Sequence, residues 1–273
     1  MLTKEENEFV TRTGPGTPMG ELYRRFWLPA LLAEELPSPD CPPIRLTILN
    51  ERLVAFKDTN GRIGFLDRRC PHRQADLFFG RNEEGGLRCV YHGWKYDVDG
   101  NCLELPNDPQ GDSFKDKIKT FAAYPGVERG GVIWIYMGPR ELKPQLPELE
   151  WARVPETHRF IRKMHIVGNF LQTMEGDIDS SHVGFLHSVL NPNAKDVGFI
   201  FKNAIPRPYL IRDKTPIWTI KDTDYGVMLA ARRKAEEDTY HWRVGQWMIP
   251  SYTLIGSAPG APYQCNIRVP LDD

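Results

Sequence analysis

Short segments of alternating apolar and polar residues recur at regular intervals through the first half of the chain. They lie at residues 44–49, 52–57, 63–67, 87–91 and 132–137. Turn-forming residues lie between segments, as in the Asp-Thr-Asn-Gly of residues 58–61 and the Asp-Gly-Asn of residues 99–101, which is typical of antiparallel hairpins. The pattern predicts an all-β first domain over residues 26–138. An N-terminal arm, residues 1–25, precedes it, with a flexible break at the Gly-Pro-Gly-Thr-Pro of residues 14–18.

The second half mixes strand and helix patterns. Residues 139–158, rich in Pro and Glu, are predicted to be a linker, and a second domain is predicted over residues 159–273. That domain opens with an apparent strand near Arg159, followed by a helix in which apolar residues recur at helical spacing and then by a loop at residues 191–195. Further strands are predicted at residues 217–221, 226–231, 241–246 and 252–255. The fold class is therefore α+β, with an antiparallel sheet and helices in the second domain.

Two Cys-His pairs are the main chemical signal. They are Cys70-Pro71-His72 and Cys89-Val90-Tyr91-His92, separated by the sixteen residues 73–88. In a Rieske [2Fe–2S] centre one iron takes two Cys and the other takes two His, so each loop supplies one ligand to each iron. A single zinc ion uses the same ligand types, but zinc loops usually supply two like ligands two to four residues apart. The spacing favours the Rieske centre, and zinc stays the alternative.

The residues after the second pair suit a buried cluster. Gly93 lets the backbone pass close to the cluster, since it has no Cβ. Trp94 and Tyr96 are placed to cover one side, and Tyr96 carries a hydroxyl that can donate a hydrogen bond. Ordinary core aromatics are an equally good interpretation of both.

A second constellation lies in residues 169–187. His182 and His187, five residues apart and close to carboxylates, suit a non-haem iron site with two His, one carboxylate and open positions. On an ideal helix these two side chains point about 140° apart, so the helix must be broken or over-wound between them, where Gly184 lies. Glu175, Asp179 and His182 are predicted to share one helix face. Taken alone, the two histidines are more often structural.

Residues 70–96, with Leu-Phe-Phe-Gly-Arg at residues 77–81, resemble the Rieske domain of aromatic ring-hydroxylating oxygenases, in the phthalate dioxygenase-like branch. Respiratory Rieske proteins carry a second Cys in each ligand loop, and neither loop has one here. The resemblance therefore implies an intracellular, low-potential centre. Gln74 departs from the family pattern, which often has Gly at this position.

The family pattern D-x-x-H-x-x-x-x-H is matched by Asp179, His182 and His187. The resemblance implies that the two histidines bind the mononuclear iron. It also implies that Asp179 is not a ligand but bridges electron transfer from His92 of one subunit to His182 of its neighbour in a homotrimer.

In the family the third iron ligand is an Asp far downstream of the second His. The end of this chain, residues 268–273, resembles a strand-end motif in the middle of the family's catalytic sheet, so the catalytic domain is interpreted as incomplete. The acidic residues after His187 have no matching context and receive no assignment: Asp196, Asp213, Asp222, Asp224, Asp272 and Asp273.

The resemblance implies the terminal oxygenase of a Rieske system with two cofactors, a [2Fe–2S] cluster and a mononuclear Fe(II). Electrons would come from a separate NAD(P)H-dependent reductase, with or without its own ferredoxin domain. O₂ would be used to hydroxylate or O-demethylate an aromatic substrate, with aromatic carboxylates favoured. The alternative is a non-catalytic Rieske electron-transfer protein or an inactive fragment.

Composition adds limits. A formal net charge of −1 gives no reason to expect a nucleic acid or membrane partner. The N-terminus has no apolar run of the signal-peptide kind, and no stretch of the sequence is long enough to span a bilayer. Cys41, Cys102 and Cys265 do not form a disulfide framework, so a cytoplasmic location is expected.

Overall fold

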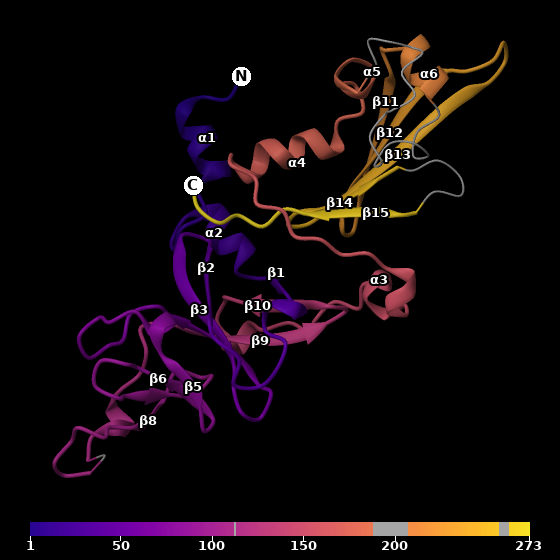
Figure 1. The fold of residues 1–273 in the computed structure, drawn as a ribbon. Coiled ribbons are helices and arrows are strands. Elements are labelled where there is room, and N and C mark those ends of the chain that lie inside the picture. Colours follow the sequence, from indigo (N-terminus) through magenta and orange to yellow (C-terminus); the bar gives the residue numbers. More distant parts are fainter. Residues whose placement is uncertain (112, 188–206, 257–261) are drawn as a thin grey trace. The chain divides into compact units, whose positions relative to one another are not determined.

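The computed structural model describes residues 1–111, 113–187, 207–256 and 262–273. The chain forms two compact units (Figure 1). The first comprises residues 1–167 together with residues 269–273, and the second comprises residues 168–268. The predicted boundaries at residues 138 and 158 stay predictions.

A six-stranded antiparallel sheet forms the body of the first unit, in the order β1-β10-β9-β4-β3-β2. Its strands are β1 (Trp27–Leu32), β2 (Ile44–Ile48), β3 (Glu51–Lys57), β4 (Ile63–Asp67), β9 (Ala123–Arg129) and β10 (Val132–Tyr136). All five residues of β10 are buried, because this strand has a neighbour on each side and side chains packed over both faces.

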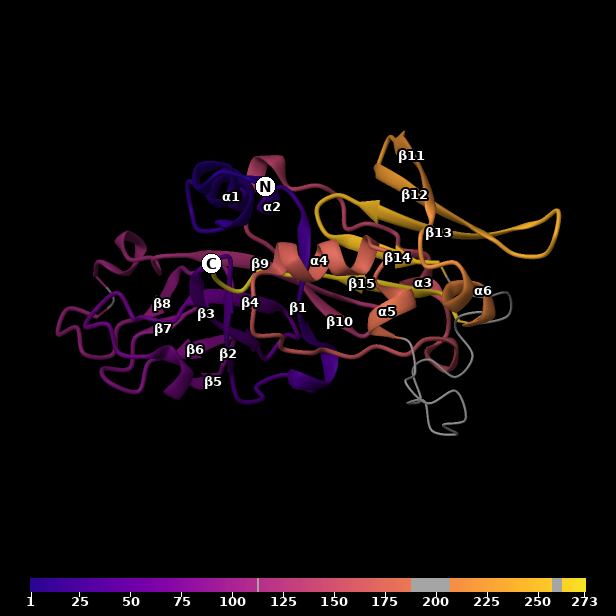
Figure 2. The same cartoon turned by 90° about the horizontal axis from the view of Figure 1, so that it is seen from above.

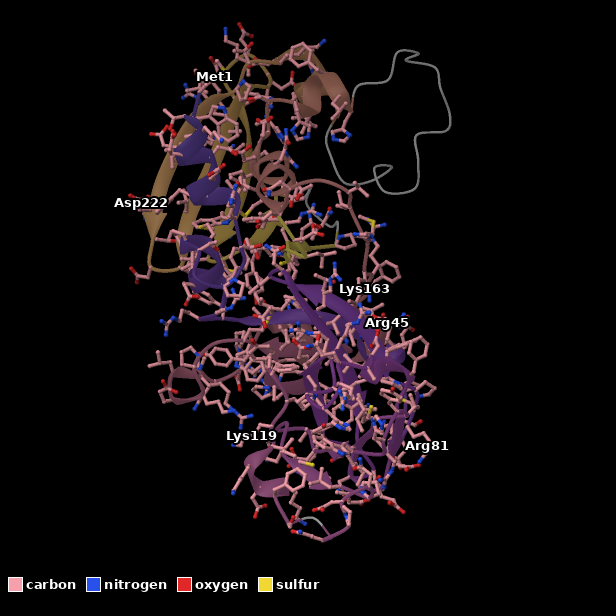
Figure 3. The ribbon with its side chains drawn as sticks, turned by 90° about the vertical axis from the view of Figure 1, so that its left-hand side faces the viewer. Met1, Arg45, Arg81, Lys119, Lys163 and Asp222 are labelled. Carbon is pink, nitrogen blue, oxygen red and sulfur yellow. The ribbon has the colours of Figure 1, made fainter. Side chains whose placement is uncertain are left out.

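A smaller four-stranded sheet carries the ligand loops of the first unit, in the order β5-β6-β7-β8. Its strands are β5 (Arg81–Glu83), β6 (Gly86–Arg88), β7 (Lys95–Tyr96) and β8 (Cys102–Glu104). It shares a buried core with the larger sheet, in which Val54, Phe56 and Leu66 meet Leu87 and Tyr96. Arg81, on the edge strand β5, points into solvent (Figure 3), as charged residues on exposed sheet edges commonly do.

Helices of the first unit are short. They are α1 (Lys4–Thr11), α2 (Pro18–Tyr23), α3 (Glu150–Arg153) and the 3₁₀ turns η1 (Ala33–Glu35), η2 (Leu77–Phe79), η3 (Lys115–Lys117), η4 (Arg140–Leu142) and η5 (Glu156–His158). The Gly-Pro-Gly-Thr-Pro segment is the start of α2: the Thr17 hydroxyl accepts from Gly20 N–H, and Pro18 occupies the first helical position. Residues 269–273 join this unit through hydrogen bonds from Leu49 N–H to Pro270 O and from Asn50 N–H to Leu271 O.

In its described residues, the second unit is a five-stranded antiparallel meander with three helices. The strands, in sheet order, are β11 (Ile217–Thr223), β12 (Gly226–Lys234), β13 (Tyr240–Met248), β14 (Tyr252–Ile255) and β15 (Gln264–Ile267). The helices are α4 (Phe170–Ile178), α5 (Val183–Leu186) and α6 (Arg207–Arg212). Helix α4 packs on β13 and β14 (Figure 2). Its buried residues are Phe170 and Met174, and Met174 Sδ accepts a hydrogen bond from Trp247 Nε1 on β13. In the described part of the chain, no helix is both long and apolar enough to cross a membrane.

The predicted fold class is confirmed, and the strand predictions correspond to β2, β3, β4, β10 and β11–β14. The strand predicted near Arg159 is wrong, because residues 159–167 form no regular element. Phe160 and Val167 are exposed there, and an alternating segment becomes a strand only where a neighbour pairs with it. The strand predicted at residues 87–91 ends at Arg88, where the chain turns into the second ligand loop. The loop predicted at residues 191–195, like Asp196, lies outside the described residues.

Candidate metal centres

Two loops with the same backbone geometry carry the four predicted cluster ligands. The first follows β4 and the second follows β6. Each is closed by the same pair of bonds at the same spacing: Cys70 N–H to Ala75 O (2.9 Å), Gln74 N–H to Cys70 O (2.8 Å), Cys89 N–H to Trp94 O (2.8 Å) and Gly93 N–H to Cys89 O (3.0 Å). Each loop therefore presents a Cys near its start and a His inside the turn.

The fourth residue after each Cys takes a left-handed backbone conformation, with φ of 57° at Gln74 and 77° at Gly93. Gly adopts this conformation freely, whereas a residue with a Cβ is strained in it. The position at which the family often has Gly is therefore the position at which the first loop adopts the left-handed conformation. Gln74 adopts this conformation as well, although its Cβ is strained there. In the sequence, this equivalence of Gln74 and Gly93 is visible because each lies four residues after a ligand Cys.

The four ligands come together as two like pairs. The rings of His72 and His92 lie 4.5 Å apart between centroids. The buried thiols of Cys70 and Cys89 are hydrogen-bonded, and this bond lowers the pKa of Cys89, which favours its thiolate. The buried Nδ1 of His72 has no hydrogen-bond partner within the described residues, as expected of a nitrogen that binds a metal.

This arrangement fits a two-iron cluster better than a single zinc ion. A thiol pair beside an imidazole pair is the donor set that a [2Fe–2S] cluster with distinct irons needs.

Aromatic side chains cover the His72 side of the site. Trp94 stacks on the His72 ring at 4.3 Å with an interplanar angle of 6°, and its indole N–H donates to Asn107 Oδ1 at 2.7 Å. Tyr96 is fully buried, with its hydroxyl 3.3 Å from Cys70 Sγ. With Cys70 bound to a metal as a thiolate, the tyrosine O–H would be the donor of this bond.

The His92 side carries exposed apolar side chains. Tyr91 packs on the His92 ring at 4.0 Å between centroids, and 62% of the Tyr91 residue remains exposed. Val90, in the same loop, is also exposed. Exposed apolar side chains thus flank His92 in its loop, whereas the exposed residues beside His72 are the polar Arg73 and Gln74.

A charge network supports the second loop from behind. Arg88 pairs with Glu83 at 2.6 Å and Glu104 at 2.8 Å, and its Nη1 donates to Gly93 O at 3.0 Å. Lys95, almost fully buried, pairs with Glu104 as well. Burial alone would raise the pKa of Glu104, but the bonds from Lys95 and Arg88 outweigh it, so the pKa lies below its usual value.

In the second unit, His182 and His187 lie at the two ends of the single-turn helix α5, with ring centroids 5.1 Å apart. The helix was predicted to be broken or over-wound between them: α5 does end between them, at Leu186, but Gly184 itself lies within the helix. A further break, after the end of α4 at Ile178, precedes His182. The rings still approach each other because His187 lies beyond the last helical residue, with ψ of 6°. Gly184 serves close packing instead, since a Cβ there would lie 2.8 Å from Leu210 O on α6.

Asp179 lies in the break and binds His182 directly. Its carboxylate accepts from Ser181 N–H at 2.6 Å, from His182 N–H at 3.1 Å and from the His182 ring at Nδ1 at 3.1 Å. Burial would raise the pKa of Asp179, but these hydrogen bonds lower it overall, so the group is a carboxylate at neutral pH. The predicted face shared with Glu175 does not exist, because the helix has ended before Asp179.

Two arginines beside this turn were not predicted. Arg233 on β12 and Arg243 on β13 both donate to Ser180 Oγ, at 3.2 and 3.3 Å. Neither guanidinium forms an ion pair with a carboxylate of the described residues. Burial lowers the pKa of Arg243, and the Arg243 charge in turn helps to lower the pKa of His187, after burial and the charge of His182. In the sequence, the only indication of their role is that both arginines lie within or close to predicted strands whose other residues are largely apolar.

Two family models match the chain, the Rieske [2Fe-2S] domain over residues 26–122 and the LigXa C-terminal domain-like family over residues 135–273. The chain belongs to the Rieske non-haem iron oxygenases. A [2Fe–2S] cluster and a mononuclear non-haem iron are therefore its cofactors.

Within these oxygenases the chain falls in the phthalate dioxygenase-like branch of large subunits. It is 40% identical to the oxygenase subunit of 3-chlorobenzoate-3,4-dioxygenase from Comamonas testosteroni, over 100% of this chain and 62% of the relative. It is 39% identical to the oxygenase subunit of phthalate 4,5-dioxygenase from Pseudomonas putida, with the same coverage. The chain thus spans about three fifths of the length of these relatives. The fold resembles crystalline dicamba monooxygenase bound to dicamba, with a TM-score of 0.68 at 24% identity over 91% of this chain and 73% of that one.

Proposed function

We propose that this protein is the terminal oxygenase component of a multicomponent Rieske system. It would use O₂ and electrons from a separate NAD(P)H-dependent reductase to hydroxylate or O-demethylate an aromatic compound. The observation that carries the proposal is the presence of both sites in one chain. The cluster-type loops are joined to a histidine pair with rings 5.1 Å apart and a carboxylate bonded to one of them. A simple electron carrier has no use for the second site.

Each site has its proposed ligands. Cys70, His72, Cys89 and His92 would hold the cluster, and His182 and His187 would hold the mononuclear iron, with a carboxylate from elsewhere in the catalytic domain as the third ligand. When bound, the two groups supply one electron at a time and an open coordination site for O₂. The orphaned Nδ1 of His72 and the paired thiols support the first assignment. The proximity of the two rings at α5 supports the second.

Asp179 is proposed to orient His182 and to connect subunits. By accepting from Nδ1 it holds the ring proton there and leaves Nε2 as the free nitrogen, which is the usual arrangement for a metal-binding histidine. We propose that in a homotrimer this carboxylate also meets His92 of a neighbouring subunit. The exposed apolar side chains of Val90 and Tyr91 beside His92 support such a contact.

An aromatic carboxylate is the substrate class that the charges favour. Arg243 is a partly buried cation near His187, without a carboxylate partner among the described residues, and a charge removed from water is costly when unpaired. A substrate carboxylate would provide the partner that the protein does not. The names of two relatives give 3-chlorobenzoate and phthalate as their substrates, and both are aromatic carboxylates.

A cytoplasmic location is proposed with this function. None of the five cysteines, all of which lie in the described residues, forms a disulfide, and cysteines without disulfides are usual in a reducing compartment.

Turnover by the holoprotein with its reductase tests the proposal. Wild-type protein should form product from an aromatic carboxylate with O₂ and NAD(P)H. Asp179→Asn should keep its iron and its cluster spectrum and lose turnover by roughly a hundredfold or more, because the path to His182 is interrupted. Turnover of Asp179→Asn close to the wild-type rate would show the bridging role to be wrong. Cluster reduction without any substrate oxidation by wild-type protein would favour the electron carrier.

A further inference from the structure

Asp179 lies in the turn between α4 and α5, whose backbone is not held by the regular hydrogen bonds of a helix or a sheet. Asp179 N–H makes the last bond of α4, to Glu175 O at 3.1 Å. Ser181 and His182 N–H groups then bond to the Asp179 carboxylate. A turn of this kind keeps one geometry only where each of its polar groups has a partner.

Ser180 receives its partners from the sheet. Arg233 Nη2 donates to Ser180 O at 2.6 Å and Nη1 donates to Ser180 Oγ at 3.2 Å, while Nε donates to Asp213 O at 3.0 Å. Arg233 is 1% exposed and Ser180 is 4% exposed. A planar guanidinium that binds two oxygens of one residue fixes both the position and the direction of that residue.

We propose that Arg233 is a positioning residue for electron transfer: by holding Ser180 it keeps Asp179 bonded to His182. The inference rests on the proposed role of Asp179. Ser180 O and Ser181 N–H belong to the same planar peptide unit. A shift of this carbonyl therefore moves the N–H that donates to the Asp179 carboxylate and lets the carboxylate turn away from the His182 ring. Lysine at position 233 keeps the charge but cannot bind both oxygens in the same fork.

Arg233 is distinct from Arg243, although both reach Ser180 Oγ. The three nitrogens of Arg233 are bonded to main-chain and hydroxyl oxygens, and the residue is closed to solvent. Arg243 makes two longer bonds, at 3.3 Å each to Gly256 O and Ser180 Oγ. A substrate carboxylate therefore finds a donor in Arg243 and not in Arg233.

The first experiment measures amide hydrogen exchange in the metal-free protein. Arg233→Lys should lower the protection of the Ser181 and His182 amides roughly tenfold, because their acceptor, the Asp179 carboxylate, is no longer held in place. Arg232→Lys is the matched control. Arg232 is the neighbouring residue on the same strand, with its guanidinium 4.4 Å from the Tyr240 ring centre, and its replacement should leave both amides unchanged.

The second experiment uses the holoprotein in a single turnover, following reoxidation of the cluster by O₂ with bound substrate. Arg233→Lys should slow reoxidation roughly tenfold or more, with iron content and substrate Kd unchanged. In an Asp179→Asn background the same replacement should have no further effect, because residues that act through one group are not additive.

Three results would overturn the inference. They are unchanged protection of both amides, an additive loss in the double variant, and a raised substrate Kd with a normal reoxidation rate at saturating substrate. The last would make Arg233 a substrate ligand. Failure of the proposed function is seen separately, as absence of substrate-dependent reoxidation in wild-type protein, and the exchange measurement then still supports or overturns the positioning role.

Discussion

At the residue scale, the shape of each ligand loop depends on the residue four positions after its Cys. Gln74 and Gly93 hold equivalent left-handed positions, but only one of them is Gly. The first loop thus carries a conformational strain that the second lacks. A Cβ at position 93 would in addition lie 2.6 Å from Pro106 Cγ, so the second loop has no space for a side chain.

Exchanging these two residue types should have opposite effects. Gln74→Gly should raise the free energy of unfolding by about 0.5–1 kcal/mol, since relief of a left-handed residue exceeds the entropy cost of Gly. Gly93→Ala should lower the free energy of unfolding and reduce cluster occupancy, because the new Cβ is strained at a positive φ and also collides with Pro106. Thermal unfolding and the visible spectrum of the loaded protein measure both. A destabilised Gln74→Gly variant would contradict the equivalence of the loops.

The Tyr96 hydroxyl should tune the cluster. Its hydrogen bond to Cys70 Sγ stabilises the reduced state, which carries one more negative charge. Tyr96→Phe should therefore lower the reduction potential by about 40 mV, the equivalent of one hydrogen bond of about 1 kcal/mol. Protein-film voltammetry measures this, with Tyr91→Phe as the exposed control. An unchanged reduction potential in Tyr96→Phe would show that the hydroxyl does not influence the cluster.

At the element scale, the position of α4 depends on one buried carboxylate. Asp177 accepts from Arg268 Nε and Nη2 at 2.6 Å each, from Thr253 Oγ1 at 3.0 Å and from Asn266 Nδ2 at 2.9 Å. These bonds tie the helix to β14, to β15 and to the residue after β15. The helix that leads into the iron site is thereby fixed to the sheet.

Asp177→Asn should destabilise the protein by about 3 kcal/mol, because it leaves the Arg268 charge without its partner in a mostly buried setting. Glu175→Gln, on the exposed side of the same helix, should change stability by less than about 0.5 kcal/mol. Urea unfolding of the two variants side by side measures the difference. Equal effects would mean that α4 is held by its apolar side chains alone.

The charge network behind the second ligand loop predicts a pH dependence. Glu104→Gln should lower stability at pH 7 by about 1–2 kcal/mol, since Lys95 then keeps only Glu84 as a carboxylate partner. The pKa of Glu104 in the folded state lies below 4.5, because the bonds from Lys95 and Arg88 outweigh burial. Its contribution is complete above pH 4.5 and is lost as the pH falls through the lowered pKa. Thermal unfolding at a series of pH values should show wild type and variant converging in acid, and a constant difference would contradict the assignment.

The elements that alternation marks, such as β3, β4 and β12, were predictable from the sequence. Strand β1, with the continuous apolar sequence Trp-Leu-Pro-Ala-Leu-Leu, has no alternation to reveal it. The ligand motifs could be recognised because both members of each Cys-His pair lie in one short loop. Arg233 and Ser180 could not, since 53 residues separate them and only sheet packing brings them together. The helix break before His182 likewise depends on hydrogen bonds that no spacing rule encodes.

At the scale of the whole molecule, each unit carries one candidate iron site on a rigid framework. The four-stranded sheet presents the cluster loops, and the five-stranded sheet holds the turn with Asp179 through Arg233. The proposed function requires electrons to pass from the first kind of site to the second, between neighbouring subunits. The central claim is therefore that both sites hold iron at the same time and are chemically separate.

Iron content together with electron paramagnetic resonance of the reduced holoprotein tests this claim most directly. Wild-type protein should contain about three iron atoms per chain and show the rhombic signal of a reduced Rieske cluster. His182→Ala should lose about one iron atom and keep that signal unchanged. A wild-type protein with zinc in place of the cluster, or a His182→Ala variant that loses the signal together with its iron, would contradict the account.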